Sequence, residues 1–130
     1  MVDELTDRPT IMVVDDDDQG RNLLAELLES CGYRAKVAAN GLSAIEQIQK
    51  DIPDVVLLDL NMPVMDGYRV LEFLCGRSEQ AAPKVIVITA QEPQYLPGAV
   101  AIFRKPVNVR QLLELVRELS RPFEPSSYPY

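Results

Sequence analysis

The sequence predicts an α/β protein with a doubly wound parallel sheet, and three observations support this fold class. Four short apolar runs are unbroken rather than alternating, and most of their residues are β-branched, which is typical of strands covered on both faces. Stretches with helical periodicity lie between runs. Strand, helix and strand in repetition build right-handed crossovers with helices on both faces of one sheet. The apolar runs are residues 11–14, 55–58, 85–88 and 100–103.

Two helices are expected in the first half of the chain, on either side of a weaker strand. The first helix has apolar side chains at the i, i+3, i+4, i+7 spacing, and Gly32 suits the position just past its end. The strand at residues 34–38 alternates, which favours an edge of the sheet. The second helix is capped by Asn40 and must stop before Pro53. The spaced apolar residues are Leu24, Leu27, Leu28 and Cys31 in the first helix and Leu42, Ile45 and Ile48 in the second.

Two further helices are expected in the second half of the chain. One follows Asp66 and Gly67 and ends near Gly76. The other is capped by Asn108 and carries a long apolar face. The apolar positions are Val70, Leu71 and Leu74 in the former helix and Val109, Leu112, Leu113, Val116 and Leu119 in the latter.

The length of 130 residues is enough for one hydrophobic core and too little for two. We expect an N-terminal arm at residues 1–8 and a single domain at residues 9–120. Residues 121–130 contain three prolines and have no apolar period, so we interpret them as a tail or linker.

Composition excludes several classes of function. Thirteen basic and twenty acidic residues give a net charge of -7, which disfavours binding to nucleic acid or to anionic membranes. The absence of histidine excludes His-based acid–base catalysis, Ser-His-Asp triads and most zinc sites. Two cysteines are too few for a disulfide scaffold, and no apolar run approaches the roughly 20 residues of a membrane span. We therefore expect a soluble protein of the reducing cytoplasm.

Chemically active side chains follow the predicted strands at the points where they end. Asp15 and Asp16 follow the first run and Asp59 follows the second. Thr89 follows the third run, and Lys105 lies just beyond the fourth. Ligands of open α/β sheets bind beyond the carboxyl ends of the strands, so we expect these side chains to converge.

Such a set of side chains suits phosphoryl transfer. Crowded carboxylates need a cation, and oxygen ligands without histidine or cysteine favour Mg²⁺. A lysine supplies fixed positive charge for a dianionic group, and a threonine hydroxyl supplies a hydrogen bond. Phosphoryl transfer depends mainly on positioning and charge neutralisation. The nucleophile would be a carboxylate, forming an aspartyl phosphate.

Four motifs stand in order at the expected strand ends. They are Val13-Val14-Asp15-Asp16, Leu57-Leu58-Asp59-Leu60-Asn61-Met62-Pro63 with Met65-Asp66-Gly67, Ile88-Thr89-Ala90, and Lys105-Pro106. Together they resemble the signatures of receiver domains of two-component response regulators, over about residues 9 to 120. The resemblance implies a flavodoxin-like sheet of five parallel strands in the order 2-1-3-4-5.

The resemblance also implies roles for individual residues. Asp59 would accept a phosphoryl group from a phosphohistidine on a histidine kinase or histidine phosphotransfer protein, and the domain would then switch protein–protein interactions. Thr89 would hydrogen-bond the phosphoryl group, and Lys105 would pair with it. The bond between Lys105 and Pro106 is cis in the family. Such a domain is a phosphoacceptor with autocatalytic phosphotransfer and self-dephosphorylation, and is not an enzyme in the ordinary sense.

A magnesium site is implied in the same way. Asp16 and Asp59 would bind Mg²⁺ directly, and Asp15 would do so mainly through water. Asn61 would contribute its backbone carbonyl oxygen. By this resemblance, Asp15, Asp16, Asp59 and Asn61 form the metal site.

One segment departs from the family pattern. Receivers usually place their fourth helix between the fourth and fifth strands, but residues 91–97 contain two prolines. A typical helix needs roughly 11 residues, so we expect the fourth helix to be short or absent. Ile102 occupies the position of the usual switch aromatic, with Phe103 beside it. We therefore expect output through another face or through a rearranged loop at residues 91–99.

Other interpretations of these residues stay open. Asp15-x-Asp17 imitates the start of a haloacid-dehalogenase-type phosphohydrolase, although Gln19 stands where Thr or Val is usual. A phosphate-independent pseudo-receiver is a third possibility. Asp17 and Asp18 are interpreted as the N-cap and a first-turn acid of the first helix. An exposed Leu23 beside Pro106 and Val107 is a candidate contact for the phosphodonor.

Overall fold

The computed structural model describes residues 8–60, 62, 66–77, 82–91 and 96–121. Five strands and four helices lie within these residues, and they alternate along the chain through most of its length. The strands are β1 (Thr10–Val14), β2 (Arg34–Ala38), β3 (Val55–Asp59), β4 (Lys84–Thr89) and β5 (Ala99–Arg104). The helices are α2 (Asp18–Ser30), α3 (Gly41–Lys50), α4 (Gly67–Cys75) and α5 (Val109–Leu119).

The five strands form one parallel sheet in the order β2-β1-β3-β4-β5. All residues of β1 and β3 are buried, and so is β4 beyond its first residue, which explains their unbroken apolar sequences. Strands β2 and β5 lie at the two edges and are only partly buried. The predicted fold class, strand order and edge position of residues 34–38 are therefore confirmed.

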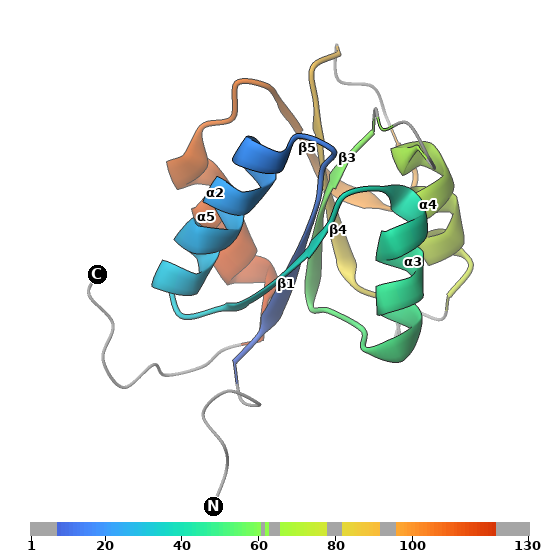
Figure 1. The fold of residues 1–130 in the computed structure, drawn as a ribbon, viewed down its shortest axis with the longest axis horizontal. Helices are drawn as coiled ribbons and strands as arrows, with labels where there is room; N and C mark the ends of the chain where they lie inside the picture. The colour runs from blue at the N-terminus through green and yellow to red at the C-terminus, as the bar shows by residue number, and fades with distance from the viewer. Residues whose placement is uncertain (1–7, 61, 63–65, 78–81, 92–95, 122–130) are drawn as a thin grey trace, which may run out of the picture.

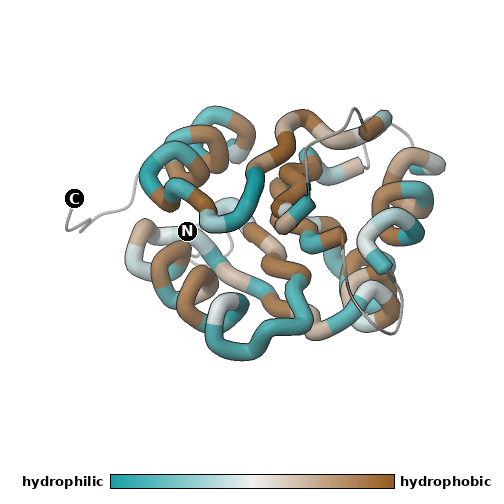
Figure 2. Tube along the Cα trace, turned by 90° about the horizontal axis from the view of Figure 1, so that it is seen from above, coloured by the Kyte–Doolittle hydropathy of each residue, from teal (hydrophilic) through white to brown (hydrophobic). Residues whose placement is uncertain are grey.

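The sheet is the middle layer of three. Helices α2 and α5 cover one face, and α3 and α4 cover the other (Figure 1). Because side chains alternate across a strand, β1 contributes Ile11 and Val13 to one core cluster and Met12 and Val14 to the other. Figure 2, seen from above, shows the hydrophobic strand segments in the centre of the trace. Burial of both sheet faces thus holds the strand ends in place.

Side-chain caps begin all four described helices. The carboxylate of Asp17 accepts a hydrogen bond from the amide of Gly20 at 3.2 Å, and Asn40, Asp66 and Asn108 make equivalent caps. Each such cap stabilises its helix by about 1 kcal/mol. Gly32 follows α2 with a φ of 93°, in the left-handed region that favours glycine. The predicted caps and the role of Gly32 are confirmed.

The connection between β4 and β5 is where we expected the fourth helix of the receiver pattern to be short or absent. The fourth of the described helices is α5, and it follows β5 rather than β4. The described residues of the connection, Ala90, Gln91 and Leu96 to Gly98, are not helical. Residues 92–95 lie outside the described residues, so the expectation for this helix stays a prediction.

The two ends of the described chain meet at the amino-terminal edge of the sheet. The carboxylate of Asp54 accepts hydrogen bonds from the amide of Thr10 at 2.8 Å and from Nε of Arg121 at 2.7 Å. Arg121 also donates to the carbonyl of Arg8 at 3.3 Å. Of the predicted arm at residues 1–8 and tail at residues 121–130, only Arg8 and Arg121 are among the described residues, and the division at 8/9 and 120/121 stays a prediction.

Gly67 brings the start of α4 against the end of β3. A Cβ at this position would lie 2.6 Å from Cα of Leu60 and closer still to the carbonyl oxygen of Asp59. Both neighbours are backbone atoms, which cannot swing aside. We therefore expect Gly67→Ala to lower the free energy of unfolding by about 1–3 kcal/mol, measured by urea denaturation.

Gly76→Ala is the matched control for this substitution. At Gly76 the nearest atom to an added Cβ is the carbonyl oxygen of Phe73 at 3.5 Å, an ordinary contact. The control should change stability by less than about 1 kcal/mol. Equal effects of the two substitutions would show that the close approach at Gly67 is unimportant.

Candidate functional site

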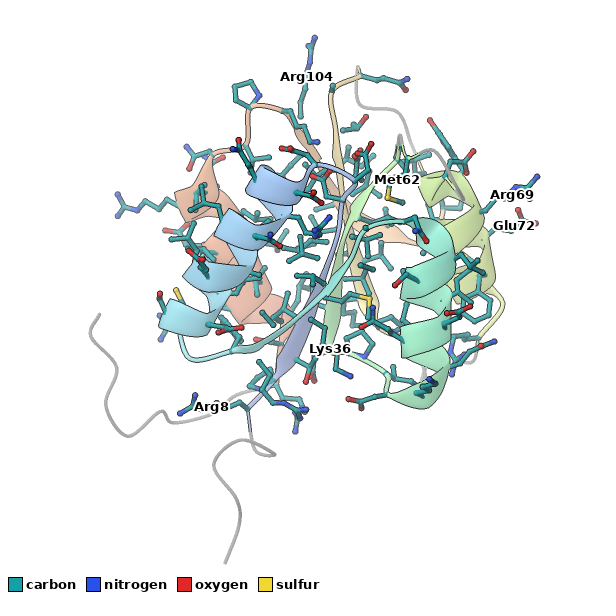
Figure 3. All side chains as sticks on the ribbon, in the orientation of Figure 1. Arg8, Lys36, Met62, Arg69, Glu72 and Arg104 are labelled. Atoms are coloured by element: carbon teal, nitrogen blue, oxygen red, sulfur yellow. The ribbon has the colours of Figure 1, made fainter. Side chains whose placement is uncertain are left out.

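The candidate site lies at the carboxyl-terminal edge of the sheet. Figure 3 labels Arg104, the last residue of β5, and Met62, just after β3, at the upper edge of the molecule. Arg8, which precedes β1, lies at the opposite edge. All strands are parallel, so the residues that follow them are brought to the upper edge.

Three carboxylates meet at this edge. Each of Asp15, Asp16 and Asp59 offers an oxygen, and these oxygens lie within 4.8 Å of one another. We call these residues the acidic cluster. Asp59 is buried, with 5% of its surface exposed, whereas Asp15 is partly buried and Asp16 is exposed. The cluster is therefore open to solvent on the side of Asp16, and Asp59 lies at its base.

The backbone fixes the acidic cluster from two sides. Asp59 is the last residue of β3 and is paired with Ile88 of β4 in the centre of the sheet. The amide of Asp15 donates to the carbonyl of Ala38 at 3.1 Å. The carboxylate of Asp15 accepts from the amide of Asp17 at 3.0 Å, which shapes the turn into α2. These contacts hold Asp15 and Asp59 before any ligand arrives.

Lys105 supplies positive charge at the same point. Its Nζ lies 3.4 Å from Oδ2 of Asp15 and 3.7 Å from Oδ2 of Asp59. Its backbone amide donates to the carbonyl of Thr89 at 2.8 Å, and the bond between Lys105 and Pro106 is cis, as the resemblance implied. One ammonium is thus shared between two carboxylates, and more than one negative charge remains.

Thr89 and Asn61 complete the predicted set. Thr89 is the last residue of β4, next to β3, and is 2% exposed. Its Oγ1 accepts a hydrogen bond from the amide of Gln91 at 3.1 Å. Asn61 lies outside the described residues, so its predicted carbonyl ligand stays a prediction. The structure brings Asp15, Asp16, Asp59 and Lys105 together and places Thr89 at the same edge of the sheet.

Arg21 is a residue that the sequence reasoning missed. From the first turns of α2 it donates through Nη1 to the carbonyl of Asp15 at 3.1 Å, and Nη2 lies 2.8 Å from Oδ1 of Asp18. The spacing of Asp18 and Arg21 on a helix suggests their ion pair. The contact with Asp15 depends on the turn between β1 and α2, and no sequence pattern indicates it.

The acidic cluster suits a hard divalent cation. Its ligands are all carboxylate oxygens, and one partly exposed side leaves room for water, which Mg²⁺ usually retains. Neutralising the charge that Lys105 leaves uncompensated gives a physical reason for a cation to bind. The residues present therefore fit a magnesium ion.

The fold and the acidic cluster define a class of protein, an α/β domain with carboxylates gathered at the carboxyl ends of its parallel strands. A family model described as "Response regulator receiver domain" matches residues 11–117. The chain belongs to the receiver domain family of two-component response regulators. Receiver domains are phosphoacceptor signalling domains rather than classical enzymes, and the hydrolase and pseudo-receiver alternatives are not favoured.

Curated relatives include proteins of different lengths. Sporulation initiation phosphotransferase F of Bacillus subtilis is 36% identical over 115 residues, which cover 83% of this chain and 90% of that protein. The positive alginate biosynthesis regulatory protein of Pseudomonas aeruginosa is 39% identical over 119 residues, covering 86% of this chain but 47% of the relative. The chain thus spans nearly all of one relative and about half of the other.

Solved structures share the fold. The response regulator TrrA of Thermotoga maritima, in complex with Mg(2+)-BeF, is 30% identical with a TM-score of 0.76, and the match covers 85% of this chain and 98% of that one. The chemotaxis protein CheY4 of Vibrio cholerae is 26% identical with a TM-score of 0.75, covering 86% and 98%. Within the described residues, we find no helix with the length and apolar character needed to cross a bilayer.

Proposed function

We propose that Asp59 accepts a phosphoryl group from a phosphohistidine of a histidine kinase or histidine phosphotransfer protein, in a reaction that depends on Mg²⁺. The observation that carries this proposal is the buried carboxylate of Asp59 at the base of the acidic cluster, with Nζ of Lys105 3.7 Å away. The modified domain then changes its contacts with other proteins. We place this chemistry in the cytoplasm, where such donors act.

The transfer is a displacement at phosphorus. A carboxylate oxygen of Asp59 forms a bond to phosphorus while the P–N bond of the phosphohistidine breaks. The electron pair of that bond returns to the imidazole nitrogen, and the product on this chain is an acyl phosphate. Lys105 pairs with the added phosphoryl oxygens, and the hydroxyl of Thr89 donates a hydrogen bond to one of them.

The metal is assigned to the acidic cluster. Asp16 and Asp59 would hold Mg²⁺ directly, Asp15 would hold it mainly through water, and Asn61 would offer its backbone carbonyl. When bound, the ion neutralises charge on the phosphoryl group and on the carboxylates. The complex of the relative TrrA with Mg(2+)-BeF supports this assignment.

A surface for the donor is proposed beside the acidic cluster. Leu23 on α2 is 61% exposed, and Pro106, after Lys105, is also exposed. Large apolar side chains that remain in solvent next to a reactive site suit a partner that must bring its histidine close. We propose that Leu23, Pro106 and Val107 contact the phosphodonor.

Intact-mass measurement tests the assignment of Asp59. The protein is incubated with acetyl phosphate and Mg²⁺, and we expect a gain of one phosphoryl group that Asp59→Ala abolishes. Asp51→Ala is the matched control. Asp51 is an exposed carboxylate just after the last residue of α3, pairs with Lys36 and does not belong to the acidic cluster. The control should label as wild type does. No gain on the wild-type protein, or an undiminished gain on Asp59→Ala, would refute the assignment.

A further inference from the structure

Arg21 is held in an environment that is unusual for an arginine on the outside of a small domain. Only 11% of its side chain is exposed, and its Nε is buried without a hydrogen-bond partner among the described residues. Arginine is seldom buried unless it is paired. The pairing here comes from the two terminal nitrogens, which contact the carbonyl of Asp15 and the carboxylate of Asp18.

Arg21 contacts both ends of the link between β1 and α2, which carries two members of the acidic cluster: the carbonyl of Asp15 in the turn and the carboxylate of Asp18 in the helix. Residues 15–17 connect β1 to α2, and Asp18 is the first residue of α2. The rigid fork of a guanidinium can bind both groups at once, whereas a lysine ammonium is a single point of charge on a flexible stem. Arg21 therefore ties the beginning of the turn to the beginning of the helix.

The contact with Arg21 completes the fixation of Asp15. The amide of Asp15 is bound to Ala38, and its carboxylate is bound by the amide of Asp17 and by Lys105. The carbonyl of Asp15 is bound by Arg21. This carbonyl belongs to the peptide that joins Asp15 to Asp16, so the contact with Arg21 restrains the backbone from which the Asp16 carboxylate extends.

We propose that Arg21 is a positioning residue for cation binding: it orients the Asp15–Asp16 peptide so that both carboxylates face Asp59. This inference rests on the proposed function, since it assigns to Arg21 the geometry of the proposed Mg²⁺ site. Groups that orient metal ligands commonly change metal affinity by 10–100-fold when they are replaced.

The direction in which Mg²⁺ affinity changes distinguishes a positioning role of Arg21 from an effect of its charge alone. Removing a positive charge beside the acidic cluster should raise the affinity for Mg²⁺ if only Coulomb interactions matter. Loss of the orientation that Arg21 gives to the turn should lower this affinity. We therefore expect Arg21→Gln to raise the Mg²⁺ concentration at half-maximal stabilisation by about 10-fold. Arg21→Lys keeps the charge but not the fork, so it should also raise this concentration, by about 3-fold or more.

The test measures melting temperature against Mg²⁺ concentration and, in parallel, the rate of labelling by acetyl phosphate. Both Arg21 variants should need more Mg²⁺ in both assays and should recover labelling when Mg²⁺ is saturating. Arg110→Gln is the matched control, because Arg110 on α5 is 89% exposed and pairs with Glu114. The control should keep the wild-type Mg²⁺ midpoint.

Three outcomes would overturn the role of Arg21. If the Arg21 variants keep the wild-type Mg²⁺ midpoint but melt at a lower temperature at every Mg²⁺ concentration, Arg21 is only structural. If their midpoint shifts to a lower Mg²⁺ concentration, Arg21 acts only by charge. If Mg²⁺ does not change the melting temperature of the wild-type protein, there is no cation binding for Arg21 to assist. A wild-type protein that Mg²⁺ stabilises but acetyl phosphate never labels refutes the phosphoacceptor proposal instead, and the Mg²⁺ midpoints still decide the role of Arg21.

Discussion

Replacing Asp59 with asparagine should stabilise the metal-free protein by about 1–2 kcal/mol, because it removes one of three crowded negative charges. Asp59 is 5% exposed, so water screens its repulsion by Asp15 and Asp16 poorly. The loss of its pairing with Lys105 costs less, because Nζ of Lys105 lies closer to Asp15. Thermal denaturation in the presence of EDTA measures the change, which for a chain of this size corresponds to a rise of about 3–8 °C.

Mg²⁺ should also stabilise the wild-type protein, and it should stabilise the Asp59→Asn variant much less. Binding to the folded state adds about 2.7 kcal/mol when the ion is present at 100 times its Kd. The asparagine variant has already lost the repulsion that the cation relieves, and it has also lost one proposed ligand. The melting temperatures of the two proteins should therefore converge as Mg²⁺ is added, and the wild-type value should be the higher one at 100 times Kd.

Asp54→Asn is the matched control and should change stability in the opposite direction. Asp54 is partly buried, as Asp15 is, and its carboxylate accepts hydrogen bonds from Thr10 and Arg121 at the opposite edge of the sheet. Removing the charge of a carboxylate that accepts two hydrogen bonds lowers the free energy of unfolding. Removing the charge of a carboxylate that is repelled by two others raises it. If Asp59→Asn destabilised the metal-free protein as Asp54→Asn does, the acidic cluster would not be strained by charge.

The fold could be predicted because a strand that is buried on both faces has an unbroken run of apolar residues. Residues 11–14 and 55–58 are unbroken apolar runs, and both became fully buried central strands. Residues 34–38 alternate and lie at an edge. The starts of two helices could be predicted because capping is local. Asn40 and Asn108 each accept a hydrogen bond from the amide three residues further along.

The acidic cluster could be predicted because a parallel sheet brings every strand end to one side. Asp15, Asp59 and Lys105 are separated by more than 40 residues from one another, yet Asp59 ends a strand and Asp15 and Lys105 each immediately follow one. The contacts between these elements were harder to foresee. The dependence of Asp15 on Arg21 and the close approach of Gly67 to Asp59 come from the angles of two turns, which spacing alone does not encode.

Replacing Lys105 with methionine should destabilise the metal-free protein by about 1–3 kcal/mol, because Asp15 and Asp59 then lose the cation that they share. The loss is smaller than that of a fully buried pair, because the Lys105 side chain is 36% exposed and its charge is partly screened by water. Methionine keeps most of the apolar stem, so the lost contact is chiefly electrostatic. Urea denaturation in EDTA measures the loss.

The same substitution should enlarge the stabilisation by Mg²⁺, because the ion no longer competes with the ammonium for the carboxylates. Lys84→Met is the matched control: Lys84 is exposed at the opposite end of β4, and its replacement should leave the Mg²⁺ response unchanged. A Lys105 variant with wild-type stability and a wild-type Mg²⁺ response would show that the ammonium does not compensate the acidic cluster.

Combining the two substitutions gives the strictest form of this prediction. Asp59→Asn should stabilise Lys105→Met more than it stabilises the wild-type protein, because the repulsion among Asp15, Asp16 and Asp59 is least compensated when the lysine is absent. Residues in one ion-pair network commonly show such coupling, of about 0.5–3 kcal/mol. Additive effects would mean that Lys105 and Asp59 do not share a network, and their separation of 3.7 Å would then carry no energetic weight.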